Sequence, residues 1–533
     1  MRKVYFLIFM VIFISCDDEN YIDLPLEEQQ YSQSFFKSFV NDPNATQLDI
    51  DLEDVLDSLS DGVGRSFFTF PDSDDYSNIP QDPLNPITAE KVVLGKLLFH
   101  ETAMGGNPRT NSNLFTYSCA SCHHAAAGFA AGIRQGIGEG GIGFGINGEA
   151  RIMDANISVD LIDIQPVRSP TVLNGAYQRI MLWNGQFGAT GPNAENDGSW
   201  ESIPENSLGF EGLEVQALKG QDVHRLLVNE SFVDNFGYRS LFDAAFPELP
   251  EAERYTRETA GLAIATFERT VLANESPWQH WLKGNVNALT ENEKKGAGLF
   301  FGKAKCYECH TGPALNDENF YALGMDDFFN SAGVVVTNTS NFQREVRYGR
   351  GGFTNNVSDR YKFKTPTLYN LIDQGIFGHG ASFTSVKDVV EYKLNGDPQK
   401  NVPMPLLAET FKEIQVLTEE EINDLVAFIE NSLRDPNLIR YVPDTVNSGN
   451  CIPNSDNQSN LDLGCEADGG GGDNGDNGGG NGNGNGNGNG NGNGNGNGNG
   501  NGNGNGNGNG NGNGNGNGNG NGNGNGNGNG NGN

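Results

Sequence analysis

The most informative stretch of this chain for its fold is the pentapeptide Cys119-Ala120-Ser121-Cys122-His123. A second copy of the motif follows at Cys306-Tyr307-Glu308-Cys309-His310. In a C-x-x-C-H motif both thiols bond covalently to the vinyl groups of a haem, and the histidine then binds the iron as its proximal ligand. Two copies therefore predict two covalently bound c-type haems. The alternatives are a redox C-x-x-C pair or a zinc site built from paired cysteines, and both leave the adjacent histidines unexplained.

The composition limits the partners of the chain. Its 533 residues include 34 Lys and Arg against 68 Asp and Glu, a formal charge of -34. This charge argues against nucleic acid and anionic membrane surfaces as partners. The acidity serves either solubility or the attraction of a basic electron donor. From about Gly469 the sequence is mostly Gly and Asn, so we expect a disordered tail over residues 469–533.

The N-terminus has the pattern of an export signal. Arg2 and Lys3 precede an apolar run from Val4 to Ile14, which is too short to span a bilayer. Ser15-Cys16 then resembles the lipobox of bacterial lipoproteins, in which the cysteine is lipidated. We expect an exported protein held to the membrane by a lipid anchor, in the periplasm or at the outer membrane or cell surface of a Gram-negative bacterium. A plain secreted protein is the alternative.

The seven cysteines are all assigned by these patterns. Cys16 takes lipid and the four cysteines of the two motifs take haem. Cys451 and Cys465 remain as a pair in a polar stretch, and in an oxidising compartment we expect them to form a disulfide that closes a short loop.

The foldable part is predicted to be mainly α. Three threonines have the position of a helix cap, Thr88, Thr290 and Thr418, and the last two are followed three residues later by a glutamate, the spacing of a capping box. A buried helix is predicted over residues 260–271 and an amphipathic one over 422–433. The glycine-rich stretch 132–148 predicts a loop whose backbone passes close to a flat ligand or to another segment.

The two motifs are followed by similar sequences, which predict an internal duplication. Pro170-Thr171-Val172-Leu173-Asn174 follows the first and Pro366-Thr367-Leu368-Tyr369-Asn370 the second. Trp183 lies 13 residues after Pro170, and His379 lies 13 residues after Pro366. The fold class is therefore two cytochrome c-like haem domains related by duplication, with long loops and a disordered C-terminal tail. We divide the chain into a signal peptide (1–16), an acidic N-terminal tether with a few short elements (17–82), two haem domains (83–285 and 286–440), a disulfide-closed loop (441–468) and the tail (469–533).

Several stretches resemble the di-haem bacterial cytochrome c peroxidases and their relatives that mature methylamine dehydrogenase. They lie between about residues 83 and 435, in family order: Leu94-Gly95-Lys96-Leu97-Leu98-Phe99, Arg168-Ser169-Pro170 with Trp183-Asn184-Gly185, Phe267-Glu268-Arg269-Thr270, Phe300-Phe301-Gly302 before Cys306, and Gly378-His379-Gly380. The resemblance implies two mostly helical haem domains that exchange electrons across their interface.

The resemblance also implies the roles of individual residues. The N-terminal haem is the peroxide site, and the C-terminal haem relays electrons from a small donor protein, a cytochrome c or a copper protein. Trp183 matches the tryptophan placed between the haems. Glu214 matches the glutamate that moves a proton between the two peroxide oxygens, with Glu211 as a second candidate.

Two departures from the family pattern concern the iron ligands. No histidine occurs between His124 and His224, so the distal histidine of typical members is missing and only Met153 offers an alternative. We therefore predict an open or easily displaced sixth position at the first haem, active without prior reduction, with His124 pointing away from the iron. At the second haem the distal position is Lys393, where the family has methionine or tyrosine; Tyr392 and Met404 are the alternatives.

The resemblance further implies a bound calcium ion, although two positions beside its ligands are Arg168 and Gln374 here and do not match. The predicted function is a peroxidase that reduces hydrogen peroxide to water, with His123 and His310 as proximal ligands. The alternatives are a long-range oxidase of a protein or organic substrate, for which a tyrosine ligand such as Tyr392 would be the signature, and a surface electron carrier without turnover.

Overall fold

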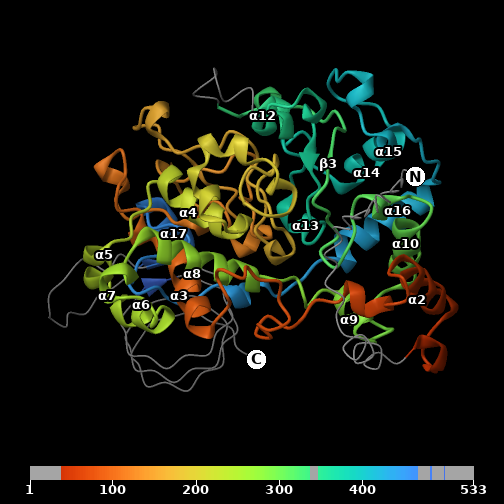
Figure 1. The fold of residues 1–533 in the computed structure, drawn as a ribbon, viewed down its shortest axis with the longest axis horizontal. Helices are drawn as coiled ribbons and strands as arrows, with labels where there is room; N and C mark the ends of the chain where they lie inside the picture. Colours follow the sequence, from red (N-terminus) through yellow and green to blue (C-terminus); the bar gives the residue numbers. More distant parts are fainter. Residues whose placement is uncertain (1–37, 336–345, 466–480, 483–496, 499–533) are drawn as a thin grey trace, which may run out of the picture. The chain divides into compact units, whose positions relative to one another are not determined.

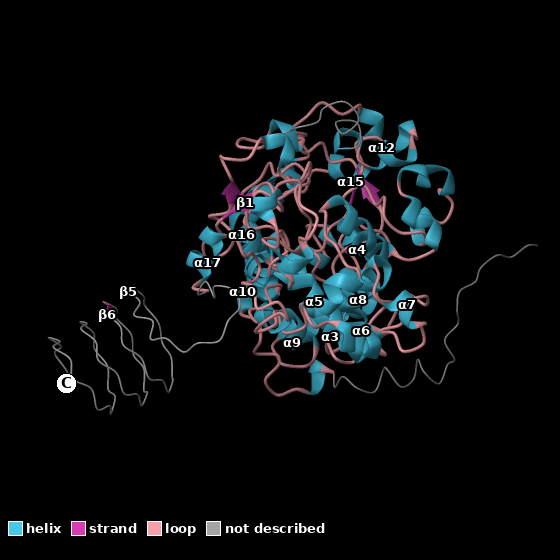
Figure 2. Ribbon diagram, turned by 90° about the vertical axis from the view of Figure 1, so that its left-hand side faces the viewer, coloured by secondary structure: helices cyan, strands magenta, loops and turns pink. Residues whose placement is uncertain are grey.

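Helices joined by long loops make up the fold (Figures 1 and 2). The computed structural model describes residues 38–335, 346–465, 481–482 and 497–498. The α-helices in this part of the chain are α2 (Gln47–Leu59), α3 (Ala89–His100), α4 (Gly212–Val223), α5 (Glu230–Asn235), α6 (Arg239–Ala245), α7 (Glu251–Arg254), α8 (Arg257–Thr270), α9 (Pro277–Leu282), α10 (Glu291–Phe301), α12 (Arg350–Thr354), α13 (Leu371–Gln374), α14 (Val386–Asn395), α15 (Glu409–Lys412), α16 (Glu419–Ala427) and α17 (Asn457–Leu463). The strands have two residues each: β1 (Gly141–Ile142) pairs with β2 (Ile152–Met153), and β3 (Phe320–Tyr321) with β4 (Phe363–Lys364).

Helices α3 and α4 pack against α8 around the first motif. Thr88 caps α3 as expected, because its side chain accepts a hydrogen bond from the backbone N–H of Lys91. The contact between α3 and α8 is close at Gly95, where an added Cβ would lie 1.9 Å from the carbonyl oxygen of Ala263. Only glycine therefore permits this helix crossing.

Helices α10 and α16 pack against each other around the second motif. Both predicted capping boxes are present, at Thr290 and at Thr418. Gly296 of α10 has the same role as Gly95, since an added Cβ would lie 2.0 Å from the carbonyl oxygen of Asp424. The predicted helix over 422–433 is a continuous α16 that ends in a π-helical turn, Phe428–Ser432.

The described part of the segment expected to be a tether, residues 38–82, is folded against the rest of the chain, which corrects the tether prediction for these residues. It contains the 13-residue helix α2, which packs against α10 of the second half. Leu52 and Leu56 are buried on one face of α2, and Asp49 is fully buried, where it accepts hydrogen bonds from Trp281 Nε1 (2.8 Å) and Lys294 Nζ (2.9 Å). Apolar residues at helical spacing and a buried ion pair hold the segment in place.

The C-terminal segment returns to the first half of the chain (Figure 1). Cys451 and Cys465 form the predicted disulfide. Between them, α17 lies against β1, and Asp462 accepts hydrogen bonds from the backbone N–H groups of Phe144 and Gly145 at 2.7 and 3.0 Å. The carbonyl oxygen of Pro453 accepts from the hydroxyl of Ser118, at the edge of the first motif, at 3.1 Å.

The chain divides into two units, Met1–Glu466 and Ala467–Asn533. In the second of these units only two dipeptides are described, β5 (Asn481–Gly482) and β6 (Asn497–Gly498), which pair in parallel. The signal peptide with Cys16 and most of the predicted disordered tail lie outside the described residues. Within the described ranges, no helix combines the length and apolar character needed to cross a bilayer.

Candidate functional site

The first C-x-x-C-H motif forms a single tight turn. Cys119–Ser121 are a 3-10 helix, closed by hydrogen bonds between Ser118 and Ser121. The Nδ1 atom of His123 lies 3.2 Å from the carbonyl oxygen of Phe129. A hydrogen bond at Nδ1 fixes the tautomer in which Nε2 carries the lone pair, the form that binds a metal. Burial lowers the pKa of His123 to about 4, so the ring is neutral as a ligand requires.

The second motif has the same local design. Cys306–Glu308 form a 3-10 helix, and the Nδ1 atom of His310 lies 3.0 Å from the carbonyl oxygen of Leu315. Burial again lowers the pKa of His310. The four motif cysteines are all free thiols rather than disulfides, and burial raises the pKa of each. Two neutral imidazoles beside free cysteine pairs fit the attachment of two c-type haems, and bound haem would supply redox chemistry at its iron.

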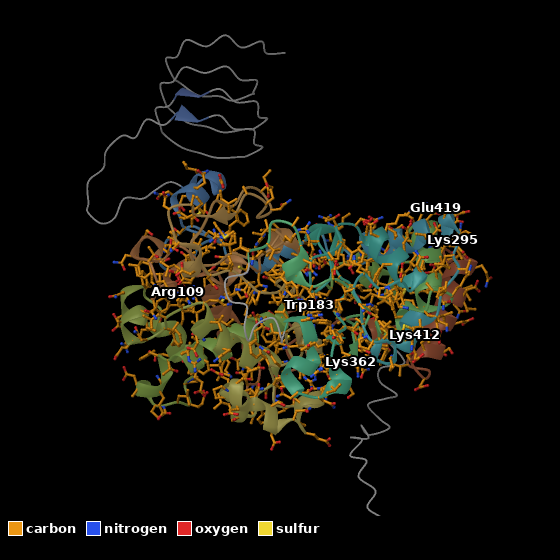
Figure 3. All side chains as sticks on the ribbon, turned by 90° about the horizontal axis from the view of Figure 1, so that it is seen from above. Arg109, Trp183, Lys295, Lys362, Lys412 and Glu419 are labelled. Atoms are coloured by element: carbon orange, nitrogen blue, oxygen red, sulfur yellow. A yellow bond between two sulfur atoms is a disulfide. The ribbon has the colours of Figure 1, made fainter. Side chains whose placement is uncertain are left out.

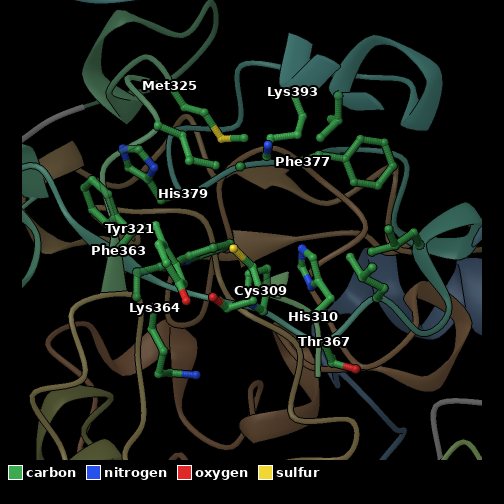
Figure 4. Close-up of a pocket in the computed structure, with 18 of the residues that line it drawn as sticks. Cys309, His310, Tyr321, Met325, Phe363, Lys364, Thr367, Phe377, His379 and Lys393 are labelled. Atoms are coloured by element: carbon green, nitrogen blue, oxygen red, sulfur yellow. The ribbon is translucent and has the colours of Figure 1, made fainter. Parts of the chain in front are cut away.

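A mostly apolar cavity adjoins the second motif and extends to the first half of the chain. Its wall includes Cys306, Cys309 and His310, and from the first half Pro170, Val172, Met181, Trp183 and Gln216. In Figure 4 the side chains of Met325 and Lys393 reach into it from the side opposite the His310 ring. This arrangement leaves space for a flat apolar ligand over the imidazole.

The ring of His124 contacts the glycine-rich loop, and its expected orientation away from the iron stays a prediction. Its Nε2 atom lies 3.0 Å from the carbonyl oxygen of Asn147, at the far end of the glycine-rich loop. The loop also crosses itself here, since a Cβ on Gly132 would lie 2.1 Å from that same oxygen. Met153, the alternative distal ligand, belongs to β2 and pairs with Gly141.

Trp183 and His379, the residues matched by the internal comparison, contact each other. Their ring centroids lie 6.3 Å apart with the planes at 65°. The indole N–H of Trp183 donates to the carbonyl oxygen of Arg168 at 2.8 Å, and the His379 ring stacks on Phe363 with centroids 3.5 Å apart. Figure 3 labels Trp183 near the middle of the ribbon. An aromatic contact thus joins the two halves beside the cavity.

Glu214 lies in a buried ion pair rather than in the cavity wall. Its carboxylate accepts two hydrogen bonds from Arg269, from Nε at 3.0 Å and from Nη2 at 2.7 Å, and both side chains are fully buried. Asn85 donates a third bond at 3.2 Å. Glu211, the second candidate, accepts from Arg269 at 3.0 Å. The structure therefore brings both predicted carboxylates together around one guanidinium.

Two residues near Glu214 were missed from the sequence. Gln216, two residues further along α4, lines the cavity, because a two-residue step turns the side chain to the other face of a helix. Glu268 of α8 is buried, its Oε2 atom has no hydrogen-bond partner, and burial together with Glu214 raises its pKa to about 8. Glu268 is also close enough to Cys119 to raise the pKa of that thiol in addition to burial.

The three predicted distal candidates at the second haem lie in different surroundings. Lys393 of α14 lines the cavity, and its ammonium donates to the carbonyl oxygen of Thr410 at 2.7 Å. Tyr392 is not in the cavity wall; its hydroxyl donates to the carbonyl oxygen of Leu323 at 2.7 Å. Met404 is 63% exposed. Met325, which no sequence pattern marked, is the methionine that lines the cavity near Lys393.

The comparisons with known proteins agree with this site. The model of the di-haem cytochrome c peroxidase family matches residues 89–287. The cytochrome-c peroxidase IdrP1 of Pseudomonas sp. (strain SCT) is 30% identical over 381 residues, which covers 68% of this chain and 85% of that protein. The chain belongs to the di-haem cytochrome c peroxidase family.

The family includes relatives with other names. The methylamine utilization protein MauG of Methylorubrum extorquens is 29% identical over 365 residues, 68% of this chain and 83% of MauG. Among solved structures, a MauG-like protein associated with microbial copper homeostasis aligns with a TM-score of 0.46 and 23% identity, over 69% of this chain and 96% of that one. A family of di-haem enzymes implies two haems and oxidoreductase activity for this chain.

The residues at the expected calcium position do not fit a calcium ion. The guanidinium of Arg168 donates to the side-chain oxygen of Gln374 at 2.7 Å, and both residues are buried. A cation would meet a fixed positive charge there, whereas calcium takes carboxylate and carbonyl oxygens. Within the described ranges, no group of three or more His, Cys, Asp or Glu could hold a metal ion.

Proposed function

We propose that this chain is a peroxidase that reduces hydrogen peroxide to water at the first haem, with electrons that enter from an external donor protein through the second haem. The observation that carries this proposal is the pair of equally built proximal sites, His123 and His310, with the contact of Trp183 and His379 between the two halves. Trp183 is the proposed relay. A small substrate such as peroxide needs no large pocket of its own.

The two halves, 83–285 and 286–440, are proposed to be duplicated haem domains. Three matched features support this: a glycine at a helix crossing, Gly95 and Gly296; a bond from the proximal histidine to a carbonyl; and an antiparallel bridge, Met181 to Phe187 and Phe377 to Phe383. Each bridge starts 11 residues after its proline, Pro170 or Pro366. Covalent attachment through the four motif cysteines belongs to the same proposal.

For proton transfer we propose a pair of carboxyl groups, Glu214 and Glu268, beside the first motif. Arg269 donates hydrogen bonds to the Glu214 carboxyl group, whereas burial raises the pKa of Glu268 to about 8 and keeps it protonated at neutral pH. A carboxyl group paired with a guanidinium, beside a second carboxyl group with a raised pKa, is suited to act with it as base and acid. Glu214 is the group predicted from the sequence, and Glu268 is added by its surroundings.

A long-range oxidase is the second candidate, because the chain is 29% identical to a methylamine utilization protein. The surroundings of Tyr392 favour the peroxidase, since Tyr392 does not line the cavity and its hydroxyl donates to the backbone carbonyl oxygen of Leu323. An electron carrier without turnover is the third. Export, the lipid anchor at Cys16 and the location at the periplasm or cell surface remain part of the proposal.

The test is a steady-state assay of the purified holoprotein with hydrogen peroxide and a series of reduced cytochromes and copper proteins. We expect turnover without prior reduction, and a large loss of turnover in Trp183→Leu with two haems still bound. An oxidase would consume peroxide only with an organic or protein substrate. A carrier would leave peroxide unchanged and would not bind cyanide at either iron, and this result would reject the proposal.

A further inference from the structure

Arg168 and Lys364 occupy matched positions in the two halves and exchange matched contacts. Each lies two residues before the proline of its repeat, Pro170 or Pro366. The backbone N–H of Arg168 donates to the carbonyl oxygen of His379 at 3.1 Å, and that of Lys364 donates to the carbonyl oxygen of Trp183 at 2.8 Å. The backbone of each cationic residue is thus hydrogen-bonded to the matched aromatic residue of the other half.

The side chains repeat this exchange. Arg168 donates to the side-chain oxygen of Gln374, and Lys364 donates to that of Gln178. The two glutamines are themselves matched, each eight residues after its proline. A cation of each half therefore donates a hydrogen bond to a glutamine of the other half, and the four residues form two equivalent contacts between the halves.

These two charges are buried without an ion-pair partner among the described residues, although Glu318 and Asp317 lie near enough to Lys364 to offset part of the effect of burial on its pKa. Arg168 and Lys364 are each 6% exposed, and in the ranges that the structure describes neither makes an ion pair with Asp or Glu. Burial lowers the pKa of Arg168 to about 10 and that of Lys364 to about 8. Arg269 is as deeply buried, but Glu214 and Glu211 compensate its charge and its pKa is raised. A neutral amide does not offset the cost of burying a charge, so a carboxylate at hydrogen-bond distance would stabilise either cation.

Both cations line the cavity that adjoins the second motif and extends to the first half. A haem bound to these motifs brings two carboxylates, its propionates, into an otherwise apolar site. Arginine binds carboxylates through two parallel N–H groups, and lysine binds them as a point charge. The propionates are thus the anions that the haem motifs themselves supply.

We propose that Arg168 and Lys364 are a matched pair of anion-binding residues that bind haem propionate carboxylates across the boundary between the halves. This inference rests on the proposal that both haems are attached. Gln374 and Gln178 hold the two cations in place, and the guanidinium supplies positive charge where the family resemblance implies calcium.

The test uses holoprotein with two haems, counted by the pyridine haemochrome spectrum, and measures the reduction midpoint of each haem by spectroelectrochemistry. Arg168→Met and Lys364→Met are expected to lower the midpoint of at least one haem and to make it depend on pH, because an unpaired propionate stabilises ferric iron and titrates. Arg168→Lys and Lys364→Arg should restore most of the shift. The matched control is Lys362→Met, which removes a lysine that is 31% exposed and paired with Asp359.

Unchanged midpoints in both methionine variants, with two haems bound, would overturn the inference while leaving the peroxidase proposal intact. A wild-type midpoint that falls when calcium is removed with EDTA and recovers on its return would also overturn it, because a metal would then supply the charge. If a methionine variant does not fold, the neutral polar variants Arg168→Gln and Lys364→Gln take its place: a lowered midpoint supports the contact, and unchanged midpoints in both variants, with two haems bound, reject it.

Discussion

Replacing Glu214 by glutamine should destabilise the protein and remove peroxide turnover together. Glu214 and Arg269 are both fully buried, and the carboxylate accepts hydrogen bonds at 3.0 and 2.7 Å from the guanidinium and at 3.2 Å from Asn85. Removing one member of a buried ion pair costs about 3–5 kcal/mol. Glutamine keeps one acceptor and Glu211 stays bonded to Arg269, so we expect the lower end, about 3 kcal/mol, or a change of about 100-fold in the folding equilibrium.

The assay is urea unfolding of the holoprotein at pH 7, followed by far-ultraviolet circular dichroism, next to peroxide turnover at low urea. Glu211→Gln is the matched control, because Glu211 is 14% exposed and makes a single bond to the same guanidinium. It should cost less than half as much. Equal unfolding free energies for wild type and Glu214→Gln would refute the ion-pair argument. Full turnover in a well-folded Glu214→Gln variant would reject the acid–base role.

Three further predictions concern other parts of the chain. Glu268 has a pKa of about 8 in the folded state against an ordinary value of 4.5, so between these pH values the folded state holds a proton that the unfolded state has released. The free energy of unfolding should therefore fall by up to about 1.4 kcal/mol per pH unit from pH 5 to pH 8 and level off above pH 8. Urea titrations of Glu268→Gln should show a flatter pH dependence. Cys451→Ser removes a disulfide with a sequence separation of 14, which should lower the free energy of unfolding by about 3 kcal/mol. Amide hydrogen exchange should become faster at Phe144 and Gly145, whose N–H groups donate to Asp462. Unchanged exchange would mean that the loop stays docked without its disulfide. Lys393→Ala should turn the second ferric haem from six- to five-coordinate in absorption and electron paramagnetic resonance spectra, while Met325→Ala should not; the opposite result would assign Met325 as the ligand.

Sequence patterns with a local physical cause were predicted well. The caps at Thr88, Thr290 and Thr418 need only residues three positions apart, and each is present. The Cys451–Cys465 disulfide followed from counting cysteines and is present as well. The di-haem family was recognised from motif order, and the comparisons confirm it. Such features depend on neighbours along the chain, which a sequence displays directly.

Features that depend on distant residues were missed. The ion pair of Glu214 joins residues 55 positions apart, and nothing near Glu214 in the sequence identifies Arg269 as its partner. The burial of Asp49 requires Lys294, 245 positions away, so the N-terminal segment was expected to be a tether. Met325 lies in a loop between β3 and α12 without periodicity. The positions of these residues depend on tertiary packing, which neither secondary-structure propensity nor residue spacing predicts.

The way the C-terminal segment lies over the first motif constrains how the protein is made. Pro453 accepts a hydrogen bond from Ser118, and Cys122 is 8% exposed. An enzyme that joins haem to Cys119 and Cys122 needs both thiols within reach. If the first haem is attached as proposed, its thioether bonds would form before residues 451–465 pack against the motif, and closure of the Cys451–Cys465 loop would then complete the enclosure of that cofactor.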